Sequence, residues 1–240
     1  GLRGPFASVA AAVFLVLLPG IALAQRGVTV DDPGDHRLGI YVTTVLGLGL
    51  IALVAVWAWP ETFPRPDSGE AGGGDWFGWS GSAMGLAGAS ALLTAGGLAI
   101  SYAFRALGAR LGWKETELVH AVMPVTRGEK WLFVVLCLAA GVSEEIVFRG
   151  FVPLFVLPWF GHYMLAALPV SLVFGILHAY QGAHGVARTS LLGLLLAAGA
   201  AMTGSLLPSM LAHAALNLLI GLVLGDSLLN AETERGNKWT

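Results

Sequence analysis

The sequence predicts an all-α protein that crosses a membrane several times. Of its 240 residues, 56% are hydrophobic and 12% are charged, and the mean hydropathy is +0.75. About a quarter of the residues of a soluble domain carry charge. A helix that crosses about 30 Å of hydrocarbon needs roughly 20 apolar residues, and about seven stretches of the chain meet that criterion. We therefore expect a polytopic transmembrane helical bundle of about seven spans.

Charged loops, proline and glycine mark the expected ends of these spans. Pro153, Pro158 and Gly161 indicate a break after the fourth span, and Pro208 separates the last two. In chain order, the expected spans lie within residues 3–26, 38–59 and 76–104, from about 131 onwards, and at 163–180, 189–206 and 209–224.

The clearest loop signals, Pro33 to Asp35 and Gly72 to Gly74, do not separate blocks of different composition. We therefore expect one membrane domain with three parts. Residues 1–130 would form the N-terminal spans and an interfacial segment, residues 131–225 the core spans, and residues 226–240 a polar tail.

Basic residues predict the orientation, because short cytoplasmic loops are enriched in lysine and arginine. The basic cluster between the third and fourth spans consists of Arg105, Arg110, Lys114, Arg127 and Lys130. This loop should be cytoplasmic, and an acidic loop should face the opposite side, with Glu61, Asp67, Glu70 and Asp75. Residues 103–130 fit either an amphipathic helix at the interface or a plain loop.

The first apolar stretch has a second interpretation. Arg3, a short apolar run and Ala22-Leu23-Ala24 are similar to a secretory signal peptide. We count the stretch as a membrane helix and keep cleavage as the alternative.

Charge and cysteine content exclude several classes of partner. A net charge of −2 provides no basic surface for a phosphate backbone, so no nucleic acid is expected. The single cysteine, Cys137, excludes an intrachain disulfide framework and a cysteine-rich metal site. The expected partners are the lipid bilayer and molecules within it.

Charged side chains inside the expected spans are the strongest functional signal, because each costs about 3 kcal/mol at the bilayer centre. Glu145 and Arg149 are four residues apart on one helical face and predict an ion pair. Glu144 lies on the face of Phe148 and is free to act as a general base. The alternative is a purely structural clamp made by all three charges.

Two further helices carry polar pairs with the same spacing. Phe174 and His178 share a face, and histidine can exchange a proton near neutral pH. His213 and Asn217 also share a face and could donate hydrogen bonds to the oxyanion of peptide hydrolysis. The alternative for each pair is an ordinary hydrogen bond within or between helices.

These pairs together resemble a known family. Glu-Glu-three-Arg, Phe-three-His and His-three-Asn are similar to the ordered motifs of the CAAX-type prenyl endopeptidases, within the wider family of CAAX proteases and bacteriocin-processing enzymes. The motif residues here are Glu144, Glu145, Arg149, Phe174, His178, His213 and Asn217. The resemblance covers mainly residues 131–224 and implies a helical bundle around a membrane-embedded chamber.

The resemblance also implies roles for these residues. Glu144 and His178 would activate water, His213 and Asn217 would stabilise the oxyanion, and Glu145, Arg149 and Phe174 would support the site. The substrate would be a membrane-associated protein or peptide. Only some members of the family cleave prenylated proteins, so the family does not define the substrate.

A metal-dependent mechanism is the main chemical alternative. The chain has no His-Glu-x-x-His motif, and we expect no cofactor. Glu144, His178 and His213 would nevertheless match the ligand set of a catalytic zinc ion. His184, between Gly182 and Gly185, is predicted to be a solvated loop residue.

Two short motifs are interpreted as coincidences of a glycine-rich loop. Gly78-Trp79-Ser80-Gly81 matches a rhomboid serine-protease motif, and Gly72-Gly73-Gly74-Asp75 matches an intramembrane aspartyl-protease motif. The first needs Ser80 near a histidine inside the bilayer, but Ser80 falls at the edge of a loop beside Asp75 and Trp76. The second lacks another aspartate within a span.

The sequence therefore predicts an intramembrane endopeptidase. A transporter or proton-relay protein is the alternative from another class, because buried charges also mark ion pathways. A non-catalytic membrane scaffold with the same fold is the third hypothesis.

Overall fold

The structure is a computed structural model that describes residues 3–25, 33–59, 76–77, 79, 81–113 and 116–225. All regular secondary structure within these ranges is helical. Among the described residues, six continuous helical stretches are long and apolar enough to cross a membrane, and α8 is a shorter apolar helix. The predicted all-α class is confirmed, and about seven spans is consistent with this count.

Fourteen helical segments lie within the described residues. In chain order they are α1 (Arg3–Ala12), π-helical η1 (Val13–Leu17), α2 (Leu18–Gln25), α3 (Pro33–Ala58), α4 (Ala83–Leu111), α5 (Glu117–Ala121), α6 (Arg127–Glu145), π-helical η2 (Ile146–Phe151), α7 (Val152–Phe160), α8 (Tyr163–Leu177), the 3-10 turn η3 (Ala179–Gln181), α9 (Gly182–Thr203), α10 (Leu207–Leu219) and π-helical η4 (Ile220–Leu224).

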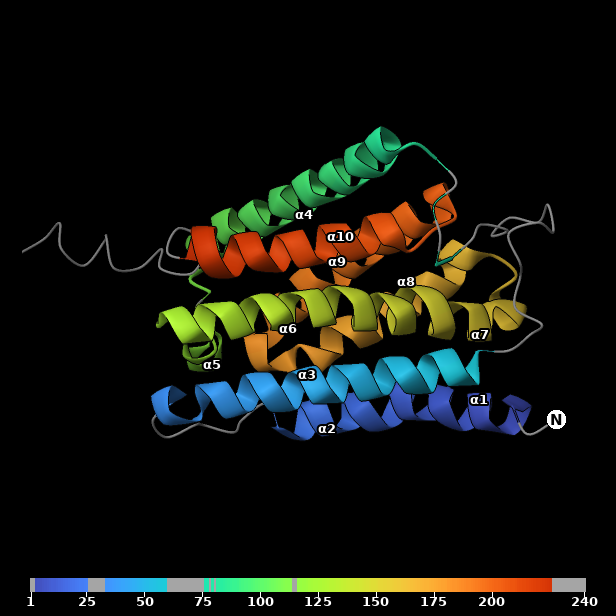
Figure 1. Cartoon of the computed structure of the whole chain (residues 1–240), viewed down its shortest axis with the longest axis horizontal. Helices are drawn as coiled ribbons and strands as arrows, with labels where there is room; N and C mark the ends of the chain where they lie inside the picture. Colours follow the sequence, from blue (N-terminus) through green and yellow to red (C-terminus); the bar gives the residue numbers. More distant parts are fainter. Residues whose placement is uncertain are drawn as a thin grey trace, which may run out of the picture.

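Helix α6 occupies the centre of the bundle. It packs against α3 on one side and α10 on the other, and α10 also contacts α4 and α9. Helix α8 packs against α9, α7 and α2. Figure 1 shows α1 and α2 alongside α3 at one edge and α4 at the opposite edge. Side chains that point inward from α6, α8 and α10 can therefore meet.

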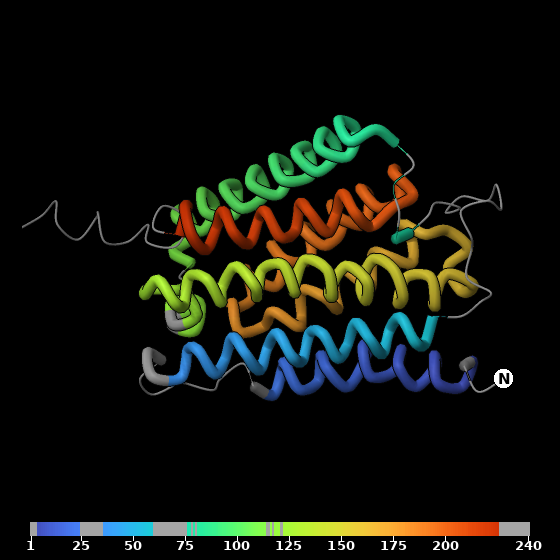
Figure 2. The backbone as a smooth tube through the Cα atoms, in the orientation of Figure 1, coloured from blue at the N-terminus to red at the C-terminus, as the bar shows by residue number. Residues whose placement is uncertain are grey.

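The fourth span is longer than predicted. Helices α6, η2 and α7 form one continuous stretch of 34 residues from Arg127 to Phe160, which Figure 2 shows as an unbroken tube. The predicted break at Pro153 and Pro158 is wrong, because Pro153 lies in the first turn of α7 and Pro158 lies inside it. Only Gly161 ends the helix, with a φ of +68° and its N–H donated to the carbonyl of Leu157.

Two other predicted boundaries are also wrong. Residues 33–35 begin α3 instead of forming a loop, because proline is well tolerated in the first turn of a helix. Helix α4 continues to Leu111, where Gly112 caps it with a φ of +70°. Residues 103–111 are therefore the end of a span and not the start of a separate interfacial helix.

The predicted loop position of His184 is wrong as well. His184 lies in the first turn of α9 and is partly buried, and its ring stacks on that of Trp113 with 5.6 Å between centroids. Thr116 donates a hydrogen bond to the carbonyl of Tyr180 at 2.6 Å. These contacts attach the connection after α4 to the turn between α8 and α9.

The start of α6 is fastened to α3. Thr126 and Glu129 form a capping box, in which the Glu129 carboxylate accepts hydrogen bonds from the backbone N–H groups of Val125 and Thr126. The other carboxylate oxygen lies 2.9 Å from Nη1 of Arg37. The buried Tyr41 donates from the same helix to the carbonyl of Val122 at 2.7 Å. Sequence position alone does not reveal this connection between spans.

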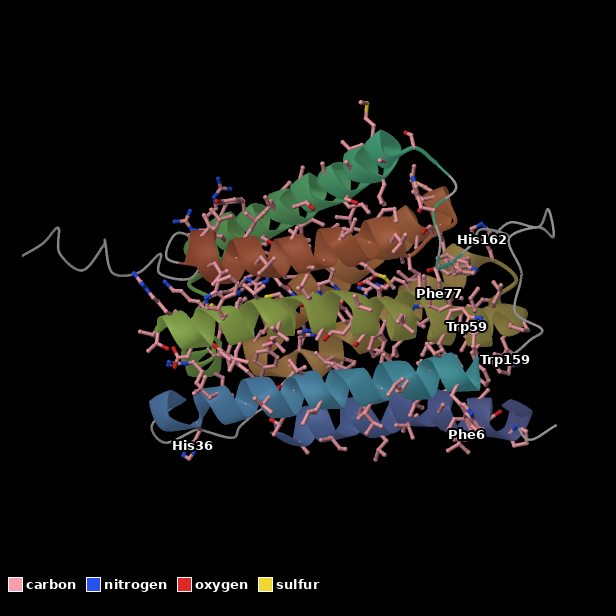
Figure 3. All side chains as sticks on the ribbon, in the orientation of Figure 1. Phe6, His36, Trp59, Phe77, Trp159 and His162 are labelled. Atoms are coloured by element: carbon pink, nitrogen blue, oxygen red, sulfur yellow. The ribbon has the colours of Figure 1, made fainter. Side chains whose placement is uncertain are left out.

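The two ends of the bundle differ in composition. Figure 3 shows Phe6, Trp59, Phe77 and Trp159 at one end and His36 at the other. The helix order places several basic residues toward the His36 end, namely Arg37, Arg105, Arg110, Arg127, Lys130 and Arg188. This end remains the predicted cytoplasmic side.

Several predicted features lie outside the described residues. They are the acidic loop with Glu61, Asp67, Glu70 and Asp75, the basic residue Lys114, and the tail 226–240. From the two short motifs they are Gly72 to Gly74 with Asp75, and Gly78 with Ser80.

Replacing Glu129 with alanine should destabilise the bundle. The Glu129→Ala variant loses the helix cap and the contact with Arg37, so we expect a loss of about 1 to 3 kcal/mol. The apparent melting temperature of the purified protein in detergent measures the effect. Lys130→Ala is the matched control, because Lys130 is the next residue and is exposed. Equal melting temperatures for the two variants would contradict this role of Glu129.

Candidate active site

The two glutamates and the arginine lie near the middle of the long central helix. Glu144 and Glu145 end α6, and Arg149 lies in η2. Nη1 of Arg149 lies 3.0 Å from Oε1 of Glu145, and the two side chains are 1% and 0% exposed. The predicted ion pair is therefore present, and it is shielded from solvent and lipid.

The Arg149 guanidinium has two further neighbours. Its Nε donates to the carbonyl of Gly193 on α9 at 3.4 Å, and its Cζ lies 4.1 Å from the centroid of the Phe174 ring. An aromatic face attracts a cation at this distance. A Cβ at position 193 would lie 3.0 Å from Nη2 of Arg149, so glycine leaves the space that the arginine occupies.

His213 bridges the two glutamates from α10. Its Nδ1 lies 2.8 Å from Oε1 of Glu145, and its Nε2 lies 3.6 Å from Oε2 of Glu144. A carboxylate only accepts hydrogen bonds, so Nδ1 carries the proton that it donates to ionised Glu145. The sequence grouped His213 with Asn217 and, as a possible metal ligand, with Glu144, but it did not predict the contact with Glu145.

Glu144 and Glu145 have different environments although they are adjacent. Oε1 of Glu145 serves both Arg149 and His213, and the side chain is fully buried. The Glu144 side chain is 15% exposed, and its buried Oε2 makes no hydrogen bond. Oε2 of Glu145 and Nη2 of Arg149 also lack hydrogen-bond partners, and Nη1 of Arg149 is held by the ion pair with Glu145, whose angle is not that of a hydrogen bond. The site therefore contains buried polar atoms that could form further hydrogen bonds.

His178 lies at the point where α8 ends. Its Nδ1 is 2.9 Å from the carbonyl oxygen of Phe174. A carbonyl only accepts, so Nδ1 is the protonated nitrogen and Nε2 of the neutral ring keeps its lone pair. Glu144, His213 and Arg149 are near enough to influence His178 electrostatically.

Phe174 connects the three predicted motifs. Its buried ring lies 4.8 Å from the His178 ring and 6.1 Å from the His213 ring, measured between centroids. The Phe148 ring packs against it at 5.3 Å. The Phe174 ring thus lies beside both histidine rings and beneath the Arg149 guanidinium. Phe174 and His178 share a helical face, as the spacing predicts.

Asn217 lies one turn beyond His213 on α10 and is partly buried. Within the described part of the chain, its carboxamide makes no hydrogen bond. Its role as a donor to the oxyanion therefore stays a prediction that rests on its position.

Two glycines allow the helices of the site to approach closely. A Cβ at Gly141 would lie 2.8 Å from the carbonyl oxygen of Met210 and 2.9 Å from the backbone nitrogen of Ala214. A Cβ at Gly175 would overlap Ser190 on α9. Sequence reasoning did not single out these residues, although Gly141 lies four residues before Glu145 and Gly175 three before His178.

The metal-dependent alternative requires three ligand side chains close enough together to bind one ion. Among the described residues, no three histidine, cysteine, aspartate or glutamate side chains are grouped so that they could hold one metal ion.

The fold and the site together define a multi-pass membrane protein with a glutamate and histidine centre between α6, α8 and α10. Residues 126–219 match the family model described as Type II CAAX prenyl endopeptidase Rce1-like. The match runs from the cap of α6 to the end of α10 and includes every predicted motif residue. It confirms the resemblance, and at the family level it supports a membrane peptidase of the CAAX-protease type.

The other two comparisons gave no match, either to a curated protein or to a solved structure.

A methyl group at Gly141 should separate the two helices that carry Glu145 and His213. Two of the three atoms that Gly141→Ala would meet belong to the α10 backbone and the third is Cβ of Ala214, so we expect a loss of about 1 to 3 kcal/mol through overpacking. Thermal unfolding in detergent measures the change. Gly128→Ala is the control, because the same helix has open space at that position. A Gly141→Ala protein as stable as Gly128→Ala would show that the approach is not required.

Proposed function

We propose that this protein is an intramembrane endopeptidase in which Glu144 and His178 activate a water molecule. The observation that carries the proposal is the difference between the two adjacent carboxylates. Oε1 of Glu145 has two close partners, Arg149 at 3.0 Å and His213 at 2.8 Å, whereas the ion-pair partner of Glu144 is more distant, Nε2 of His213 at 3.6 Å. A desolvated carboxylate without a close structural partner is suited to accept a proton from water.

His178 complements Glu144 in this proposal. Because its Nδ1 donates to the Phe174 carbonyl, its Nε2 can accept a hydrogen bond from the same water. Glu144 takes one proton as the water oxygen bonds to the scissile carbonyl carbon, and Nε2 of His178 orients the other O–H. Glu144 then returns its proton to the leaving nitrogen as the C–N bond breaks, which gives a carboxylic acid and an amine.

The oxyanion formed in the first step needs hydrogen-bond donors. Asn217 can supply an N–H from its carboxamide. His213 can supply one only from Nε2, since Nδ1 is already directed at Glu145. His213 must therefore be doubly protonated to act as a donor to the oxyanion.

The substrate class follows from the membrane location of the site and from the description of the matched family. A membrane-anchored protein or peptide would reach Glu144 from the bilayer. The words "prenyl endopeptidase" in the family description direct the first assay to a prenylated peptide with a C-terminal CAAX sequence.

Removal of either water-activating group should abolish cleavage. In proteoliposomes with an internally quenched farnesylated CAAX peptide, Glu144→Ala, Glu144→Gln and His178→Ala should each lower kcat by at least about 100-fold, the usual contribution of a general base. His162→Asn is the control, because His162 is exposed at the start of α8 and asparagine can still cap that helix.

Two outcomes would contradict the proposal. Cleavage retained by a folded Glu144→Ala or His178→Ala protein would exclude the mechanism. Cleavage by the unsubstituted protein that is equally fast with the peptide lacking its farnesyl group would exclude prenyl recognition and leave the mechanism standing.

A further inference from the structure

We propose that Tyr163 is a positioning residue of this site, because its hydroxyl replaces a helix hydrogen bond that Pro153 removes at the carbonyl of Arg149. This inference rests on the proposed function for its effect on catalysis. The hydrogen bond itself can be tested without a substrate.

The need for an outside donor follows from the sequence. In an α-helix, the carbonyl of residue i accepts from the N–H of residue i+4. The residue four positions after Arg149 is Pro153, which has no N–H. Tyr163, at the start of α8, donates its O–H to the Arg149 carbonyl at 2.7 Å in a buried environment. Because the chain is α-helical again from Val152 onward, the tyrosine hydroxyl takes the place of the N–H that Pro153 lacks.

The carbonyl lies in a segment that is not regular α-helix. Residues Ile146–Phe151 are π-helical, and the N–H of Val152 bonds to the carbonyl of Val147, five residues earlier. Single π-helical turns inside α-helices are rare and occur frequently at functional sites. The direction of the Arg149 side chain depends on this widened turn, so a hydrogen bond that holds the turn also holds the guanidinium.

Tyr163 is itself held firmly. It is 6% exposed, and its ring packs against that of Trp76 with 5.6 Å between centroids. Trp76 is 4% exposed, and its carbonyl accepts a hydrogen bond from the N–H of Leu206 at 2.9 Å. The donor is therefore anchored by the connection before α4 and by the turn between α9 and α10, outside the helix that it supports.

A change at the Arg149 carbonyl would affect Glu144 through a chain of contacts. The Arg149 guanidinium binds Glu145, Glu145 accepts a hydrogen bond from Nδ1 of His213, and Nε2 of His213 lies 3.6 Å from Oε2 of Glu144. Loss of the Tyr163 hydroxyl should loosen the first member of this chain. The effect should appear in kcat and not in KM, because the chain ends at the groups proposed to perform the chemistry.

The test uses the full-length protein and four variants. Tyr163→Phe should lower kcat about fivefold to tenfold, the change expected for one hydrogen bond of ordinary strength, with an unchanged KM. Pro153→Ala restores a backbone N–H four residues after Arg149, so the double variant Pro153→Ala/Tyr163→Phe should recover most of the lost kcat. Pro153→Ala alone should remain close to the unsubstituted protein.

Tyr41→Phe is the matched control. Tyr41 is also buried, with 1% of its surface exposed, and also donates to a backbone carbonyl at 2.7 Å, but its acceptor is Val122, outside the site. It should lose stability without losing kcat. An equal fall in kcat for Tyr41→Phe and Tyr163→Phe, or no recovery in the double variant, would overturn the proposal.

A second measurement does not depend on activity. Hydrogen–deuterium exchange of peptides covering residues 145–153 should be faster in Tyr163→Phe, and exchange should be slower again in the double variant. Faster exchange that Pro153→Ala reverses would support the inference even if the protein cleaves no tested peptide. Exchange unchanged by Tyr163→Phe would overturn it, whatever the result of the cleavage assay.

Discussion

The buried ion pair between Arg149 and Glu145 is the interaction on which the arrangement of the site depends. Neither side chain is exposed by more than 1%, so each charge requires the other. The pair also has partners on three other helices. Glu145 accepts from His213 on α10, and the guanidinium contacts the Phe174 ring on α8 and the Gly193 carbonyl on α9. One pair of charges thus determines how four segments of the bundle meet.

The pair also explains why neighbouring glutamates can serve different purposes. Successive residues of a helix point in different directions, so only Glu145 faces Arg149, four residues later. Glu144 has no ion-pair partner among the described residues closer than Nε2 of His213, at 3.6 Å. His213 lies between the two carboxylates and is closer to Glu145, at 2.8 Å. The site therefore separates a structural carboxylate from an available one.

Close helix packing makes these contacts possible. Membrane helices associate through small residues that let their backbones approach. Gly141 brings α10 against α6, Gly175 brings α9 against α8, and Gly193 leaves space for the guanidinium. The distances among the ionisable groups thus depend on residues that carry no chemistry of their own.

The sequence by itself determined the helical membrane class, the pairing of Glu145 with Arg149 and the shared face of Phe174 and His178, because apolar length and helical spacing are local properties. Only the tertiary structure decided that His213 contacts Glu145, 68 residues away, and that the central helix continues past Pro153. A proline removes one helix hydrogen bond, which leaves a carbonyl in need of another donor. Here the replacement comes from Tyr163, a residue of the next helix, and spacing along the chain does not predict such a contact.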